Sequence, residues 1–241
     1  MTVSIEIVED PARVCADLML DACASDGCTQ IVLAGGSTPK AANEIFAAAV
    51  RERQLSLGDV SFWLGDDRAV GPDDPNSNYG MIRATLLEPL ADLTKPLIHR
   101  IKGELGYAVA ADQYEQCLRH SGVGRFDLLL LGIGPDGHTL SLFPGKPAVR
   151  ERGRLVVGVP EAGMEPFVPR VSFTLSAVAL AKHVVFLAEG EGKADALTRA
   201  FGPDAVPDPA IPSSLIPTVA HNETLLADDA AAAGLAGAAR S

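Results

Sequence analysis

Residues 30–40, QIVLAGGSTPK, indicate how this chain folds. An apolar run, 30–34, leads into two glycines, and Ser37 and Thr38 then precede Pro39. Ser and Thr are common helix N-caps and proline suits the first helical position, so these residues predict a strand, a tight turn and a helix start. Such a turn presents unpaired backbone N–H groups and the positive end of a helix dipole, which attract an anion such as phosphate.

The glycine-rich turn has two interpretations. In the first, Gly35 and Gly36 let the backbone approach a phosphate group, and Ser37 and Thr38 add hydroxyl donors. In the second, the same residues form an ordinary strand-to-helix turn with a good N-cap. The Walker A pattern, Gly-x-x-x-x-Gly-Lys-Ser/Thr, is absent, so a nucleotide-binding loop of that type is not expected.

Strand and helix patterns alternate along almost the whole chain. This alternation predicts an α/β fold with a parallel sheet and helices on both of its faces. Several apolar runs are continuous, as in strands that are buried on both sides. The expected strands are 4–8, 30–34, 60–64, 97–101, 126–132, 155–159, 170–174 and 184–188. The expected helices are 11–24, 39–51, 79–87, 108–120, 177–182 and 193–201.

The 241 residues suit a single domain that spans 1–241, because neither a linker nor a repeat is visible. Residues 202–217 hold five prolines and predict a long surface loop. Residues 230–241 are rich in Ala and Gly and predict a frayed tail.

Composition restricts the classes of partner. With 47% hydrophobic residues and a net charge of −11, the chain is expected to be globular and to bind neither nucleic acid nor an anionic membrane, both of which require surplus Lys and Arg. Its apolar runs are too short to span a bilayer, and its acidic start, MTVSIEIVEDP, does not resemble a signal peptide. We therefore expect a cytoplasmic protein, taken as a monomer. Four cysteines without a C-x-x-C pair predict buried thiols: Cys15, Cys23, Cys28 and Cys117.

A second polar segment follows the strand expected at 60–64. The sequence FWLGDDRAV places Asp66, Asp67 and Arg68 just beyond that strand, where the ligand crevice of a parallel sheet lies. A polar loop, 72–80, then leads into a helix whose N-cap is Asn76, Ser77 or Asn78. The alternative is a solvated acidic turn with no ligand.

A third segment, FDLLLLGIGPDGHTLSLFPG at 126–145, is the most informative about function. Its G-x-G-x-x-G spacing resembles a dinucleotide fingerprint, but Pro144-Gly145 stops the segment too early for the long helix that this fingerprint requires. What remains is Asp136 and His138 in a glycine-rich turn at the end of a strand. A histidine beside a carboxylate can accept a proton near neutral pH, so His138 is a candidate general base, although it could also be merely exposed.

Two basic residues complete the set of candidates. Arg170 lies in VPRVSFT, and Lys193 lies early in a helix, where a cation opposes the helix dipole unless an anion is nearby. Both therefore suit a phosphate ligand, or else they are solvated surface charges.

Six ordered segments together resemble the 6-phosphogluconolactonase family: LAGGSTPK, LGDDR, NSNYG, LLLLGIGPDGHTLSLFP, PRVSFTL and GEGKADAL. The resemblance extends along nearly the full chain. It implies a Rossmann-like fold with a mostly parallel sheet, and hydrolysis of 6-phospho-D-glucono-1,5-lactone to 6-phosphogluconate in the oxidative pentose phosphate pathway. It also implies that neither a metal nor an organic cofactor takes part and that the partner is a small-molecule substrate.

The resemblance implies roles for particular residues. His138 would activate water and Asp136 would orient it. Arg68 would contact the substrate and could stabilise charge on the lactone oxygen, with Asn78 nearby. The phosphate would be held by Gly35, Gly36, Ser37, Thr38, Arg170 and Lys193. The family's usual Gly-Asp-Glu-Arg is Gly-Asp-Asp-Arg here, which leaves the contacts of Asp67 in doubt, and Asp66 receives no catalytic role.

Two other functions stay open on the sequence. The isomerase and deaminase branch of the same superfamily would share the phosphate loop, but there a Glu stands five residues after the histidine, where this chain has Phe143, and a Tyr is expected near Arg68. A non-enzymatic sugar-phosphate-binding regulator would need no catalytic pair, yet Asp136 and His138 are both present.

Overall fold

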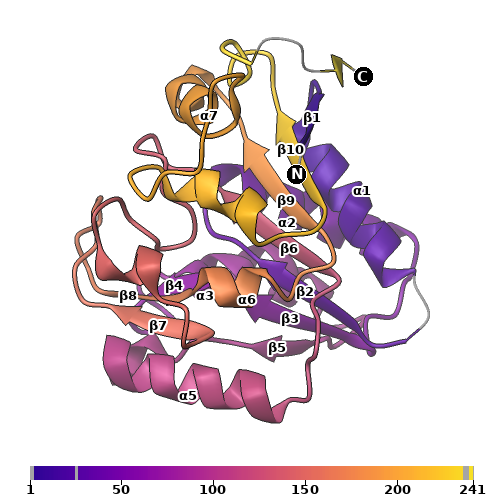
Figure 1. Ribbon diagram of the computed structural model, residues 1–241. Coiled ribbons are helices and arrows are strands. Elements are labelled where there is room, and N and C mark those ends of the chain that lie inside the picture. The colour runs from indigo at the N-terminus through magenta and orange to yellow at the C-terminus, as the bar shows by residue number, and fades with distance from the viewer. Residues whose placement is uncertain (1–2, 25–26, 236–238, 241) are drawn as a thin grey trace.

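The computed structural model describes residues 3–24, 27–235 and 239–240, which form an α/β fold around one large parallel sheet (Figure 1). The strands of this sheet lie in the order β11-β1-β10-β9-β6-β2-β3-β5, and every neighbouring pair is parallel. Their bounds are Ser4–Ile7 (β1), Thr29–Leu33 (β2), Val60–Leu64 (β3), Leu97–His99 (β5), Leu128–Gly132 (β6), Val184–Ala188 (β9), Glu223–Ala227 (β10) and Ala239–Arg240 (β11).

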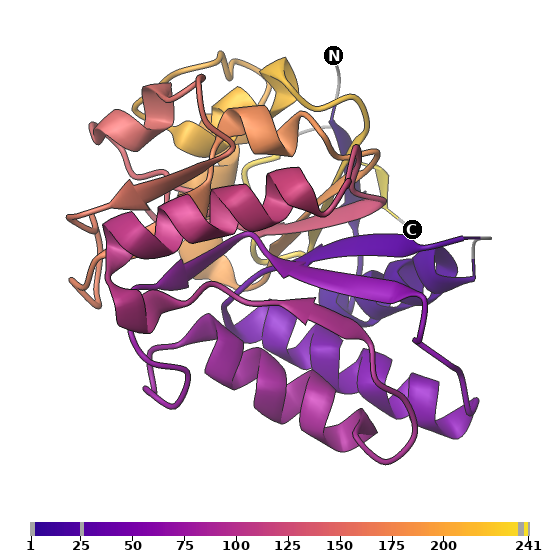
Figure 2. The same cartoon turned by 90° about the horizontal axis from the view of Figure 1, so that it is seen from below.

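Helices cover both faces of the sheet, as predicted (Figure 2). On one face lie α1 (Pro11–Cys23) and α2 (Ser37–Glu52), and α5 (Tyr107–His120) lies on the opposite face. The helix expected at 79–87 is present, but its middle part is a π-helix rather than an α-helix. Its parts are α3 (Asn78–Ile82), the π-helix Arg83–Leu87 and α4 (Glu88–Leu90). The remaining helices are α6 (Leu175–Val178) and α7 (Ala194–Phe201).

A second, three-stranded sheet is antiparallel and has the order β4-β8-β7. It contains β7 (Val156–Val159) and β8 (Arg170–Phe173), so the expectation that these segments follow the parallel βα alternation is wrong. The third member, β4 (Asp66–Arg68), was not predicted because its three residues are all charged. β10 was also missed, because Glu223 and Thr224 interrupt the apolar pattern of a strand that is nevertheless buried throughout.

The order of the strands creates the crevice. From β2 the chain passes through α2 to β3 on one side, and after β5 and α5 it returns to form β6 on the other side of β2. The loops after β2 and β6 therefore diverge from the same edge of the sheet, which is where ligands bind in open parallel sheets.

Two expectations about the C-terminal part are wrong in part. Within the stretch predicted as a surface loop, a 3₁₀ segment, Pro212–Thr218, buries most of its residues. Within the predicted frayed tail, Ala231, Ala232 and Leu235 are buried and β11 pairs with β1, whereas residues 236–238 and 241 lie outside the described residues. The assignment of a single domain stays a prediction.

The cysteines are less uniform than expected. Cys15 is buried, Cys23 is half-buried, and Cys28 and Cys117 are exposed. All four are free thiols. Within the described residues, no helix is both long enough and apolar enough to pass through a bilayer.

The buried 3₁₀ segment gives a test of the fold. Ile216 is 0% exposed, so Ile216→Ala should lower the free energy of unfolding by about 2–5 kcal/mol through lost burial and a residual cavity. Val206 lies in the same proline-rich stretch but is 69% exposed, so Val206→Ala should change stability by less than about 0.5 kcal/mol. Urea unfolding of both variants checks the pair, and equal losses would contradict the packing described.

Candidate active site

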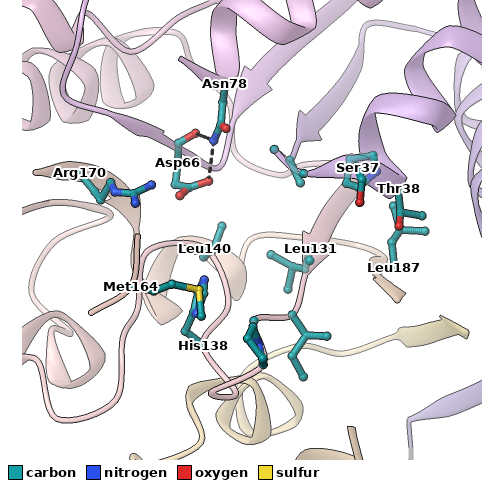
Figure 3. Close-up of a pocket in the computed structure, with 18 of the residues that line it drawn as sticks. Ser37, Thr38, Asp66, Asn78, Leu131, His138, Leu140, Met164, Arg170 and Leu187 are labelled. Carbon is teal, nitrogen blue, oxygen red and sulfur yellow. Dashed lines mark hydrogen bonds between the residues drawn. The ribbon is translucent and has the colours of Figure 1, made fainter. Parts of the chain in front are cut away.

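A pocket of about 220 Å³ opens where β2, β3, β6 and β9 end (Figure 3). The structure brings together segments that are far apart in the sequence. Nine of the predicted site residues line the pocket: Gly35, Gly36, Ser37, Thr38, Arg68, Asn78, His138, Arg170 and Lys193. The tenth, Asp136, does not line it but contacts His138.

The turn after β2 leaves the N-terminus of α2 without a side-chain cap. Gly36 has φ 111°, a conformation that favours glycine, and it precedes α2 without a side-chain cap on the first N–H groups of the helix. Gly35 has no room for a side chain, since a Cβ there would lie 2.1 Å from Asn78 Oδ1. The loop therefore leaves the N-terminal end of a 16-residue helix open toward the pocket.

The two hydroxyls of this turn differ. Thr38 is buried and donates its hydroxyl hydrogen to Glu189 Oε2, 2.8 Å away at the end of β9. A hydroxyl has one hydrogen, so in this arrangement Thr38 offers an anion only lone pairs. Ser37 is exposed at the pocket, which makes it the better placed donor.

The glycine-rich turn after β6 leaves room for the His138 side chain and its contact with Asp136. His138 Nδ1 lies 2.5 Å from Asp136 Oδ1, and the His138 backbone N–H donates to the same oxygen at 3.1 Å. A Cβ on Gly134 would lie 2.1 Å from His138 Nδ1, and Gly137 has φ 86°. The close approach of His138 and the positive φ thus account for Gly134 and Gly137, two of the three glycines that resemble a dinucleotide fingerprint.

The Asp136–His138 contact affects the carboxylate. Burial by itself would raise the pKa of Asp136, but the hydrogen bond and charge of His138 outweigh burial and hold that pKa below its ordinary value. Asp136 therefore stays ionised around neutral pH and accepts the Nδ1 hydrogen. This leaves Nε2 of the neutral imidazole as the acceptor.

The two aspartates after β3 have different neighbours. Asp67 is 2% exposed and accepts hydrogen bonds from the backbone N–H groups of Arg68 at 2.7 Å, Asn78 at 2.6 Å and Tyr79 at 3.0 Å. It thereby joins β4 to the first turn of α3. The shorter Asp, whose contacts were in doubt, thus has a structural role at the start of this helix.

Asp66 lines the pocket, which the sequence did not settle. Its Oδ2 accepts a hydrogen bond from Ser141 Oγ at 2.5 Å. Its Oδ1 accepts one from Asn78 Nδ2 at 3.3 Å (Figure 3). Asp66 therefore connects three segments of the wall: the end of β3, the start of α3 and the histidine turn.

Three cations face the pocket. Arg68 and Arg170 stand opposite each other in the β4–β8 pairing, and Lys193 Nζ donates to the backbone oxygen of Ile133 at 2.8 Å. Arg170 is 4% exposed and donates to the backbone oxygens of Val168 and Pro166. Burial lowers the pKa of both Arg170 and Lys193. Within the described part of the chain, none of the three cations has a carboxylate within ion-pair distance, so an anion in the pocket would find positive charge already in place.

Other lining residues were not selected from the sequence. Met164 and Glu165 lie in the segment between β7 and β8, which carries no recognisable motif. Leu140 has φ 54°, unusual for a residue other than glycine, and only the structure reveals it. Phe143 does lie inside a quoted motif, five residues after His138. Among the residues described, no cluster of three or more His, Cys, Asp or Glu could hold a metal ion.

The fold and the pocket place the chain among α/β enzymes that act on small molecules. The family model described as glucosamine-6-phosphate isomerases/6-phosphogluconolactonase matches residues 4–226, so the chain belongs to this family. Within it, the chain is a hydrolase of the 6-phosphogluconolactonase group, because the similar curated relatives carry that name at 34–38% identity.

Two relatives and two solved structures illustrate the similarity. The 6-phosphogluconolactonase of Nostoc sp. is 36% identical over 230 residues, which cover 90% of this chain and 92% of that protein. The human 6-phosphogluconolactonase is 38% identical over 172 residues, or 69% of this chain and 66% of that protein. The structure of 6-phosphogluconolactonase from Leishmania guyanensis has a TM-score of 0.81 and 27% identity, with 98% of this chain and 100% of that chain covered. A monomeric glucosamine-6-phosphate deaminase has a TM-score of 0.83 but 20% identity, with 97% and 99% covered, and so shares the fold.

The burial of Asp67 gives a test by pH. Burial, working against three backbone N–H donors, raises the pKa of Asp67 to about 6 from an ordinary value of 3.8. The folded protein then binds this proton more tightly than the unfolded chain, so the Asp67 contribution to stability is greatest below pH 4 and falls as the pH rises to about 6. The free energy of unfolding of wild type minus that of Asp67→Asn should therefore fall by roughly 3 kcal/mol over this window.

Urea unfolding at several pH values measures this difference. The exposed Asp204→Asn is the matched control, and its difference from wild type should stay flat across the same window. A difference for Asp67→Asn that rises with pH would show that the backbone donors, rather than burial, dominate the ionisation of Asp67.

Proposed function

We propose that this enzyme hydrolyses 6-phospho-D-glucono-1,5-lactone to 6-phosphogluconate, the second step of the oxidative pentose phosphate pathway, with water activated by His138. The relatives named 6-phosphogluconolactonase support the substrate. The observation that carries the mechanism is the 2.5 Å contact of His138 with Asp136 at a pocket that also holds three cations without a carboxylate partner among the described residues.

His138 would act as the general base. With its Nδ1 hydrogen donated to Asp136, its Nε2 accepts a proton from a water molecule that attacks the lactone carbonyl carbon. The charge of Asp136 then stabilises the imidazolium that forms. When the ring C–O bond breaks, the leaving alkoxide takes the proton back from His138, so the histidine returns to its initial state.

The phosphate group would lie at the open N-terminus of α2. The backbone N–H groups of that turn and the Ser37 hydroxyl donate to it, while Arg170 and Lys193 supply charge. Thr38 has a different part in this arrangement, because its hydroxyl hydrogen points to Glu189 and positions the turn against β9.

Arg68 would face the reacting end of the substrate. The Arg68 guanidinium donates from Nη1 to the backbone oxygen of Asn76, while its buried Nε has no hydrogen-bond partner within the described residues. Such a cation can stabilise negative charge on the lactone oxygen as water adds. Asn78 holds the adjacent wall through Asp66.

This apparatus is small but sufficient for the reaction. A cyclic ester opens slowly without a catalyst, so a general base worth about 10²- to 10⁴-fold, together with a few oriented donors, is enough. No covalent nucleophile is required. A reaction without metal or organic cofactor, a monomeric state and a cytoplasmic location stay predictions.

The first test concerns His138. The lactone is generated in place from glucose 6-phosphate with a dehydrogenase, and 6-phosphogluconate formation is followed against the spontaneous background. Wild type should accelerate hydrolysis strongly, and His138→Ala should lower kcat by about 10²- to 10⁴-fold because water loses its base. His221→Ala, which changes an exposed histidine outside the pocket, should keep wild-type kcat.

The pH profile adds a second readout. The kcat/KM of wild type should fall toward low pH, because a protonated imidazole accepts no further proton. Nearly full activity of His138→Ala would remove the histidine from the mechanism. Folded wild type that does not accelerate hydrolysis would overturn the lactonase proposal, and glucosamine 6-phosphate would then be tested as substrate.

The next prediction separates phosphate binding from catalysis. Lys193→Ala and Arg170→Ala should each raise KM for the phosphorylated lactone by about tenfold or more, with little change in KM for unphosphorylated gluconolactone, because each removes a charge-assisted contact to phosphate. Lys95→Ala, at an exposed lysine outside the pocket, is the matched control. Equal losses on both substrates would exclude these residues from the phosphate site.

A further inference from the structure

The Phe143 ring lies beside two of the predicted site residues, His138 and Arg170. It is 2% exposed and still lines the cavity, five residues after His138. Its ring centroid lies 4.6 Å from that of the His138 imidazole, at an interplanar angle of 44°. Arg170 Cζ lies 5.9 Å from the same centroid. One aromatic ring thus contacts the base and approaches the buried guanidinium.

We propose that Phe143 is a positioning residue whose ring orients His138 and stabilises its imidazole after it has taken a proton. The proposal rests on the proposed function, in which His138 cycles between neutral and protonated forms. An aromatic face attracts a cation within about 6 Å of its centroid, with a gain of about twofold to fivefold in the equilibrium. The neutral imidazole gains less, so the contact favours the state that follows proton transfer.

The surrounding contacts keep the ring in place. A Cβ added to Gly163 would lie 2.9 Å from Phe143 Cβ, so the segment between β7 and β8 packs directly on this residue. On the other side, the Ser141 hydroxyl is bound to Asp66 and the Ser141 backbone N–H donates to Ser172 Oγ. The turn that carries Phe143 is therefore held from two directions, and its ring is pre-organised for the histidine.

Other charged groups around His138 do not replace this contact. Asp136 is hydrogen-bonded to Nδ1, and cations stand on the pocket wall. The charged side chains on elements that face the pocket are Asp66, Arg68, Glu165, Arg170 and Lys193. A conservative change at Phe143 leaves all of these charges present, so its effect on the titration of His138 reports on the ring.

The experiment compares Phe143→Leu, which keeps an apolar side chain without a π face, with Phe143→Tyr, which keeps the ring. Phe143→Leu should shift the acid limb of the kcat/KM profile to lower pH by roughly half a unit, because the imidazole loses a partner that favours its protonation. The kcat should fall about two- to fivefold. Phe143→Tyr should restore the wild-type limb.

A measurement independent of activity is the ¹H NMR titration of the His138 C2–H resonance, assigned with His138→Ala. Its midpoint should move to lower pH in Phe143→Leu by the same half unit. Phe46→Leu is the matched control, because Phe46 is fully buried in α2 and packs on Phe62, so it creates a cavity without touching His138. Circular dichroism shows whether each variant is folded.

The outcomes separate the two proposals. A folded Phe143→Leu whose His138 titration and acid limb match wild type, or a Phe46→Leu that shifts both equally, overturns the role of the ring. If wild type has no lactonase activity, the proposed function fails, and the NMR titration alone then decides whether Phe143 stabilises the protonated imidazole.

Discussion

The parallel pairing of β2 with both β3 and β6 is the constraint on which the site depends. Because parallel strands point the same way, the turns after these strands and after β9 meet at one edge of the sheet. The glycine turn, the aspartate segment, the histidine turn and the loop with Lys193 each start from a buried strand whose position is set by the core. Rigid strands therefore place polar groups that are more than a hundred residues apart in the chain.

A second layer of contacts then orients these groups. Asp67 binds the first turn of α3, Asp66 connects that turn to Ser141, and Glu189 binds Thr38. Buried polar groups are costly unless they are hydrogen-bonded, and here the bonds that satisfy them also fix neighbouring turns relative to one another. The acidic side chains of the site thus work mainly as connectors, whereas its cations remain available for a ligand.

Three cations line the pocket although the protein as a whole has a net charge of −11. Arg68 and Arg170 face each other across β4 and β8, a like-charge pair that an anion between them would relieve. Burial of Arg170 and Lys193 adds to this, since it disfavours their charged forms until a counter-charge arrives. The free protein therefore holds positive charge that the proposed phosphorylated substrate would neutralise on binding.

The sequence by itself determined the α/β class and most helices and strands, because these follow from local patterns of apolar spacing, caps and glycines. The ten candidate residues, nine of which line one pocket, came from the polar motifs together with the family resemblance. Their roles stay proposals. Only the tertiary structure decided that 155–159 and 170–174 join an antiparallel sheet with β4, that most of 212–218 is buried, and that Thr38 turns to Glu189. Strand partners, burial of a proline-rich segment and the direction of a hydroxyl all depend on residues distant in sequence, and no local pattern encodes such contacts.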